Sequence, residues 1–116
     1  MELHKYTIQQ IELIEQAIEM IELNHSRCVI VINQSNKVVG ILSEGDILRA
    51  VLKGVSIKSP ISNVMNPSYK SLFEKDENKV IELLIKGITL IPILNDQNEL
   101  QDIVVYKDFI ANIFNK

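Results

Sequence analysis

The sequence contains a single cysteine, Cys28, and no long apolar run. One cysteine excludes a disulfide or a cysteine zinc cluster within the chain. Cys28 begins the run CVIVI, so we expect a buried core thiol and not a nucleophile or a metal ligand. The longest apolar stretches, CVIVI and ITLIPIL, are far shorter than the ~18–20 residues that a membrane span requires. No membrane is therefore expected among the partners.

Basic clusters, glycine loops and histidine pairs are also lacking. The 12 basic residues are scattered among 15 acidic ones, for a net charge of −3, which disfavours nucleic acid as a partner. The four glycines form no phosphate-cradling loop, and His4 and His25 have no metal-ligand spacing. We therefore expect no catalytic residues and no metal site. The start MELHKY does not resemble an export signal, so the expected location is the cytoplasm.

What the sequence does contain is an internal repeat with an offset of 62 residues. Apolar positions coincide along both halves at this offset, and so do several polar ones. Identical pairs include Asn33 with Asn95, Asn36 with Asn98, Ile41 with Ile103 and Asp46 with Asp108. Each half has the same order of elements: helix, strand, strand, helix.

Apolar spacing predicts these elements one by one. In the first half we expect a helix over residues 11–24, strands over 27–32 and 38–42, and a helix over 45–54. Four isoleucines form the predicted apolar stripe of the first helix, and a second stripe lies on the helix that ends at Gly54: Ile11, Ile14, Ile18 and Ile21; Ile47, Leu48, Val51 and Leu52. In the second half we expect an edge strand over 69–73, helices over 78–87 and 108–114, and strands over 89–94 and 100–105.

These elements predict an α+β fold of two pseudo-twofold-related repeats, each a small β-sheet with two helices, packed sheet to sheet. We place the first repeat at residues 1–58 and the second at 59–116, with a linker at about 55–67. A helical turn at ISNVM is expected to carry Val64 and Met65 into the core. Neither half, at ~55 residues, buries enough surface to be stable alone.

The stretch GILSEGD, residues 40–46, carries the most specific motif: glycine, two apolar residues, a hydroxyl residue, and an aspartate three positions later. Together with the linker ISNVMN, the strand IPILND and the repeat, it resembles the tandem cystathionine β-synthase (CBS) domains called a Bateman module. The resemblance covers essentially the whole chain. The stretch SEGDILRAVLKG is similar to modules fused to sugar-nucleotide transferases, which implies a catalytic domain after Lys116 or a partner enzyme of that kind.

The chemistry of the motif fits a nucleotide. An aspartate in the first turn of a helix can cap backbone amides or accept hydrogen bonds from the two hydroxyls of a ribose. The resemblance implies the second role for Asp46 and Asp108. A hydroxyl at the strand end, here Ser43, can donate to a phosphate beside a helix N-terminus. Ile91 and Pro92 are expected to line an adenine slot.

The second repeat departs from the motif, because Val105 replaces the hydroxyl residue and Asp102 replaces the glycine. A carboxylate near a phosphate would repel it. The resemblance implies that Lys107 compensates in part, and that Arg27 reaches a phosphate. We therefore expect one better site around Ser43 and Asp46 and a weaker one around Asp108.

Two functions follow from this interpretation. The first is a non-catalytic regulatory module that binds AMP, ADP or ATP between the repeats, needs no cofactor, and controls an attached or partner enzyme. The second is a ligand-free assembly module that forms a homodimer through its helices. For each candidate residue a plain structural role stays open: a helix cap for the aspartates, a strand-end hydroxyl for Ser43, and a solvated charge for Lys107 and Arg27.

Overall fold

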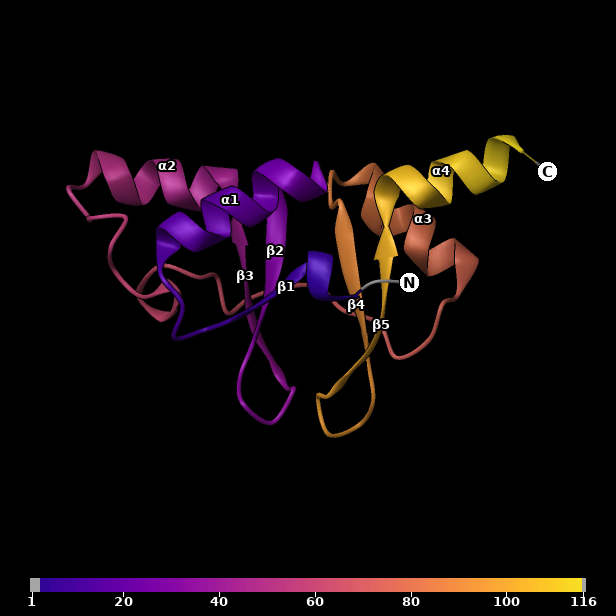
Figure 1. The fold of residues 1–116 in the computed structure, drawn as a ribbon. Helices are drawn as coiled ribbons and strands as arrows, with labels where there is room; N and C mark the ends of the chain where they lie inside the picture. The colour runs from indigo at the N-terminus through magenta and orange to yellow at the C-terminus, as the bar shows by residue number, and fades with distance from the viewer. Residues whose placement is uncertain (1–2, 116) are drawn as a thin grey trace.

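In the part of the chain that the structure describes, two small β-sheets lie side by side, with four helices over one end and the sides, and with the hairpin ends uncovered (Figure 1). The computed structural model describes residues 3–115. The first half contains β1 (Thr7–Gln9), α1 (Ile14–Asn24), β2 (Cys28–Ile32), β3 (Val38–Ser43) and α2 (Glu44–Leu52). The second half contains α3 (Glu77–Ile85), β4 (Leu90–Leu94), β5 (Leu100–Val105) and α4 (Tyr106–Phe114). Short 3₁₀ turns lie at Leu3–Lys5 and Ile61–Asn63.

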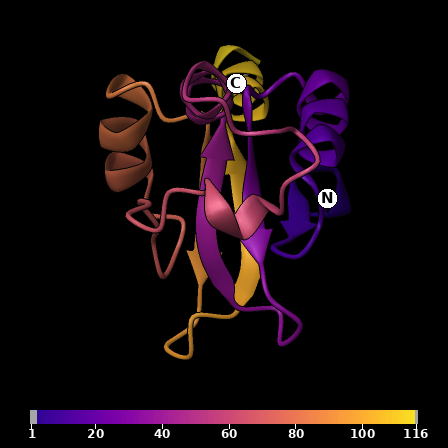
Figure 2. The same ribbon diagram turned by 90° about the vertical axis from the view of Figure 1, so that its left-hand side faces the viewer.

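The predicted repeat and α+β class are confirmed. At an offset of 62 residues, the bounds of β2, β3 and α2 coincide with those of β4, β5 and α4. Even the irregularity in the antiparallel pairing repeats: the register shifts between Val31 and Ile32 and again between Ile93 and Leu94. The helices α1 and α3 lie on opposite sides of the sheets (Figure 2).

The two sheets differ in one strand. In the first, β1 pairs in parallel with β2, and the Ile30 N–H donates to the Tyr6 carbonyl at 2.7 Å. The equivalent of Ile30 is Pro92, which has no N–H to donate. Parallel pairing in the second sheet is accordingly reduced to a single bridge at Leu72 with Ile93, inside the predicted edge strand. Pro92 itself only accepts there, from the Leu72 N–H at 3.1 Å.

The first helix is shorter than its isoleucine pattern predicts. It begins at Ile14, because residues 7–9 form β1 and the chain needs a turn before the helix. Ile11 lies in that turn and is 65% exposed, so its assignment to the apolar stripe was wrong. The helix stops are as predicted: Gly54 and Gly87 follow α2 and α3 with φ of 85° and 93°, a conformation that glycine adopts freely.

The core has three parts. One cluster lies under α1 and α2, another under α3, and the third fills the space between the two sheets. The third cluster combines side chains of both repeats: Tyr6, Cys28, Ile30 and Val38 from the first, and Leu90, Leu94, Leu100, Ile103 and Val105 from the second. This shared cluster confirms the predicted packing of sheet against sheet.

The hairpin tips also join the two repeats. Asn36 and Asn98 adopt left-handed φ values of 61° and 67°, which asparagine tolerates better than most residues. Their carbonyls accept from Leu100 N–H at 3.1 Å and Val38 N–H at 3.0 Å respectively, each across to the other hairpin. The Asn98 amide adds a bond to the Val38 carbonyl at 2.8 Å. The two hairpin tips are thus joined by a pair of equivalent backbone hydrogen bonds, as the pseudo-twofold relation requires.

The segment between the repeats packs back on the first one. Ile61 is fully buried beside α1, and Val64 and Met65 lie partly buried against the same cluster, as predicted. Asn66 pairs with Ile41 in an isolated antiparallel bridge. The domain boundary at residues 58 and 59 stays a prediction. None of the helices in the described part of the chain has the length and apolarity to cross a membrane.

Only one of the four side chains in the predicted apolar stripe of α2 is buried. Ile47 is buried, but Leu48, Val51 and Leu52 are 65%, 49% and 87% exposed. These three side chains are spaced as a helix stripe should be, yet they project from the molecule because α2 lies at its edge (Figure 1). Exposed apolar side chains on one helix form a candidate interaction surface.

Candidate functional site

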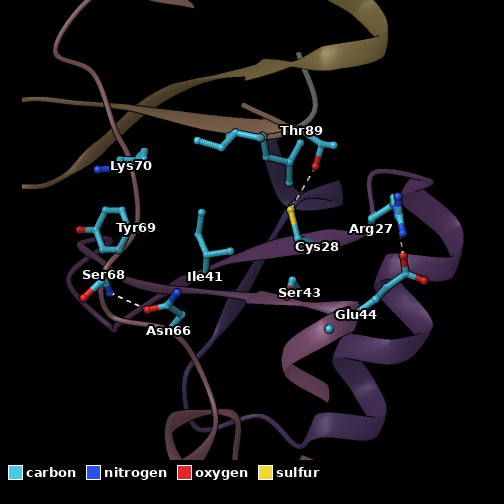
Figure 3. A pocket seen from close by; sticks show the side chains of 14 residues that line it. Arg27, Cys28, Ile41, Ser43, Glu44, Asn66, Ser68, Tyr69, Lys70 and Thr89 are labelled. Atoms are coloured by element: carbon cyan, nitrogen blue, oxygen red, sulfur yellow. Dashed lines mark hydrogen bonds and ion pairs between the residues drawn. The ribbon is translucent and has the colours of Figure 1, made fainter. Parts of the chain in front are cut away.

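A cleft of about 350 Å³ opens between the two repeats, within the size range of small-ligand sites. Four segments border it: the start of β2, the junction of β3 and α2, the linker end, and the loop before β4. Its lining residues are Arg27, Cys28, Ile41, Ser43, Glu44, Gly45, Asn66, Ser68, Tyr69, Lys70, Gly87, Ile88, Thr89 and Leu90. Figure 3 shows Arg27 and Glu44 at one end and Tyr69 and Lys70 at the other. A basic side chain thus lies at each end.

Ser43 lines this cleft, whereas the Asp46 carboxylate serves as a helix cap. The Oδ2 atom of Asp46 accepts from the N–H and the hydroxyl of Ser43 at 3.0 and 2.9 Å, and the Asp46 N–H donates back to Ser43 Oγ at 3.1 Å. This reciprocal box satisfies free amides at the start of α2. The Oδ1 atom accepts from Arg49 at 2.8 Å. The structure therefore gives Asp46 the capping role, with Ser43 as the N-cap residue.

Arg27 and Glu44 form an ion pair at one end of the cleft, with Nε and Oε1 3.0 Å apart (Figure 3). Arg27 has a φ of 69°, which a residue with a long side chain rarely adopts. The Glu44 N–H donates to the Arg27 carbonyl at 3.0 Å and helps to fix this conformation. Glu44 therefore holds Arg27 through both its backbone and its side chain.

Cys28 lies in the wall of the cleft and is 8% exposed, as expected for a buried thiol. Burial raises the pKa of the thiol, and the charges of Asp46 and Glu44 act in the same direction, while a hydrogen bond with Thr89 opposes them. Thr89 Oγ1 lies 3.5 Å from the sulfur and donates to the Ser26 carbonyl at 2.6 Å. The thiol is therefore held in its neutral form within a polar contact that joins the two repeats.

Ile91 and Pro92, predicted to line the adenine slot, are buried inside β4. The chain borders the cleft just before them, at Ile88, Thr89 and Leu90. Every residue of β4 is buried, so the alternation of polar and apolar residues that marks an exposed face is missing there. The linker residues Tyr69 and Lys70 were not predicted for the site, because only the packing of the linker brings them to it.

The corresponding positions of the second repeat are arranged differently. Gly45, which lines the cleft, corresponds to Lys107, whose Nζ donates to the Asn24 carbonyl at 2.5 Å. Asp108 is exposed in the first turn of α4, and the N-cap position there is Val105, which has no capping hydrogen bond. The offset of 62 would have revealed the exchange of glycine for lysine from the sequence.

Asp102, which replaces the glycine of the motif, is paired with Lys75 at 2.5 Å. Partial burial alone would raise the pKa of Asp102, but hydrogen bonds from Lys75 and the Ile103 N–H, with the charge of Lys75, outweigh it and lower the pKa. The Asp102 carboxylate is therefore ionised, and it is already bound to Lys75 and the Ile103 N–H. No group of three or more His, Cys, Asp or Glu side chains within residues 3–115 is placed to hold a metal ion.

Comparison with known proteins agrees with this architecture. Residues 5–53 match the family model of the CBS domain. They form a CBS domain, and over its described length the chain has the fold of a CBS-domain pair. Two uncharacterized proteins of Helicobacter pylori are 41% identical over 59 residues and 33% identical over 85 residues. The matches cover 49% and 69% of this chain but only 18% and 26% of those proteins.

Solved structures of the same fold come from several organisms. A protein from Vibrio cholerae described as an acetoin utilization protein (AcuB) has a TM-score of 0.83 at 22% identity, over 97% of this chain and 84% of that one. Protein MJ1225 from Methanocaldococcus jannaschii has a TM-score of 0.77 at 27% identity, over 94% of this chain and 46% of that one. The CBS domain protein PAE2072 from Pyrobaculum aerophilum, solved with AMP, has a TM-score of 0.73 at 17% identity, over 96% of this chain and 92% of that one.

Proposed function

We propose that this chain is a non-catalytic regulatory module that binds an adenine nucleotide in the cleft between its repeats. The observation that carries the proposal is the cleft itself, which lies at the start of α2 and contains a hydroxyl, Ser43, and two cations, Arg27 and Lys70. A helix N-terminus with a nearby cation, here Arg27, favours a phosphate. The AMP complex of PAE2072, a protein of the same fold, supports this ligand class.

In the proposed complex the phosphate lies at the end of the cleft with Arg27 and Ser43. The base lies toward Ile41 and Tyr69 at the opposite end (Figure 3). For a ribose hydroxyl to reach Asp46, the Oδ1 atom must exchange its bond from Arg49 for one from the ribose. Arg49 is exposed, with 65% of its side chain accessible, so this exchange needs no change in the core.

The second repeat is proposed as the weaker site. Lys107 fills the position of Gly45, and Asp108 is available only at the surface. If an anion reached this site, it would have to compete with the Asn24 carbonyl for Lys107. We therefore propose one nucleotide per chain and assign Ile91 and Pro92 to support of the cleft-bordering loop.

Calorimetric titration with AMP, ADP and ATP tests the proposal, and the Gly45→Gln variant makes the test specific. This variant adds a side chain at the wall of the cleft without adding a charge. It should reduce nucleotide affinity at least tenfold by filling the cleft. Val51→Gln is the matched control, since Val51 is half exposed on the same helix and does not line the cleft. The proposal fails if no nucleotide binds wild type at millimolar concentration, or if both variants bind equally.

The exposed side chains of α2 favour a second candidate, a homodimer through the helices. Leu48 and Leu52 on α2 and Phe114 on α4 are 65%, 87% and 80% exposed. Sedimentation of wild type and Leu48→Lys, each with and without AMP, separates the two functions. A ligand-free assembly module predicts a dimer that Leu48→Lys dissociates, with no heat of nucleotide binding. An attached or partner sugar-nucleotide transferase is the proposed target of regulation in either case.

A further inference from the structure

Two hollows of the molecule share one wall. Besides the cleft, a groove of about 660 Å³ lies between α1 and α2. Its floor is apolar, with Ile18, Ile21, Ile47 and Leu48, and its rim is polar, with Glu22, His25, Arg27 and Glu44. Arg27 and Glu44 are the residues that line both the cleft and the groove. Their ion pair therefore separates the two hollows.

The ion pair is suited to exchange. The side chains of Arg27 and Glu44 are 79% and 50% exposed, and an ion pair so accessible to water is weak. A phosphate is a stronger partner for the guanidinium than Glu44, because it carries more charge and can accept two parallel hydrogen bonds where Glu44 accepts one, from Nε. An anionic ligand in the cleft would thus draw the Arg27 side chain toward itself.

The backbone around the pair does not need to move in this exchange. The Arg27 carbonyl stays bonded to the Glu44 N–H, at 3.0 Å, whichever partner the guanidinium has. Only the side chain of Arg27 turns. The Glu44 carboxylate then remains beside the groove without its cation, together with Glu22 on the same rim.

We infer that the Arg27–Glu44 ion pair couples the cleft to the groove between α1 and α2, so that a phosphate bound in the cleft makes the groove more negative. The inference rests on the proposed function, because it needs an anionic ligand in the cleft. By linkage, whatever changes the charge of the groove also changes the affinity of the cleft for phosphate. The signal is one of charge and does not require the repeats to shift.

Binding of AMP and of adenosine to Glu44→Gln tests the coupling. In this variant Arg27 is not held by a carboxylate, so AMP should bind about twofold to fivefold more tightly than to wild type. Adenosine, which has no phosphate, should bind equally to both. Glu19→Gln is the matched control: Glu19 is exposed on α1 and lines neither the groove nor the cleft, so its substitution should leave AMP affinity unchanged.

A second arm excludes a general charge effect. Removing any carboxylate near a phosphate reduces repulsion, so Glu44→Gln is repeated in an Arg27→Gln background. If the effect passes through Arg27, the gain disappears there. Isotope-labelled methyl groups report on the groove: AMP should shift the Ile18 resonance in wild type more than adenosine does, and this difference should vanish in Glu44→Gln.

The failures are distinguishable. If AMP produces no heat with wild type or any variant, the proposed function is overturned and the coupling with it. If AMP binds but the Glu44→Gln gain persists in the Arg27→Gln background, or adenosine gains equally, the coupling alone is overturned. A wild-type Ile18 shift that is the same for AMP and adenosine also overturns it.

Discussion

At the scale of single residues, most polar side chains around the cleft already have a partner within the protein. Ser43 and Asp46 satisfy each other, Arg27 is paired with Glu44, and Cys28 contacts Thr89. A ligand that binds these side chains therefore has to replace their partners within the protein. Exchange is easiest at the exposed pairs, because water already competes for them.

Cys28 offers a direct measure of cleft occupancy. Its raised pKa means that the reactive thiolate is a smaller fraction at any given pH than for a free cysteine, and burial blocks the reagent as well. We expect iodoacetamide to modify the folded protein at least about tenfold more slowly than the unfolded chain. The rate for the folded protein should also keep increasing with pH beyond the pH at which the rate for the unfolded chain levels off. Saturating AMP should slow it further, since Cys28 lines the cleft.

The measurement is mass spectrometry of labelled protein over time, at several pH values, with protein in 6 M guanidinium chloride as the unfolded reference. Cys28→Ser gives the background, because it leaves no thiol in the chain. A rate equal to that of the unfolded chain would contradict the buried position. AMP binding without protection would place the nucleotide elsewhere.

At the scale of elements, the close packing of β3 against the linker explains why the motif begins with a glycine, Gly40. A Cβ added at Gly40 would lie 3.0 Å from the Asn66 carbonyl oxygen and 3.0 Å from the Met65 sulfur. Asn66 pairs with Ile41 there, so a side chain at position 40 would crowd the linker where it meets β3. The linker in turn carries Tyr69 to the cleft. The glycine thus helps to form the site without touching a ligand.

Gly40→Ala should destabilise the protein by about 1–3 kcal/mol, because backbone and a packed side chain must both shift. Urea unfolding followed by circular dichroism measures this. Gly45→Ala is the control: its added Cβ would meet only the mobile guanidinium of Arg49, at 3.2 Å, and alanine favours a helix. Gly45→Ala should be neutral or stabilising. Equal midpoints for the two variants would show that the close approach at Gly40 has no energetic weight.

Elements with a long periodic pattern could be predicted, and those that depend on contacts between segments could not. Apolar spacing predicted β2, β3 and α2, and β4, β5 and α4, to within two residues at each end. The three-residue strand β1 was missed, because its parallel pairing with β2 leaves no local pattern. Ser43 was found through its motif, whereas Tyr69 and Lys70 reach the cleft only through the folded path of the linker.

At the scale of the whole molecule, the two repeats share their central core. Ile103 of β5 is fully buried in the cluster that also contains Ile30 and Val38 of the first repeat. The hairpin tips are joined by reciprocal backbone bonds, and Thr89 bonds to the Ser26 carbonyl at the other end of the sheets. The cleft lies between these two joints, so its shape depends on both repeats.

A cavity in the shared core should therefore weaken both halves at once. Ile103→Ala should lower the free energy of unfolding by about 2–5 kcal/mol, the usual range for a buried large side chain. Native-state hydrogen exchange should show the same loss for the Ile30 amide in β2 as for the Ile93 amide in β4. Phe73→Ala, at a side chain that is 77% exposed, should change stability by less than about 0.5 kcal/mol. If exchange accelerates only in β4, the repeats open independently, and a ligand between them would order each half separately and could not bind to one preformed cleft.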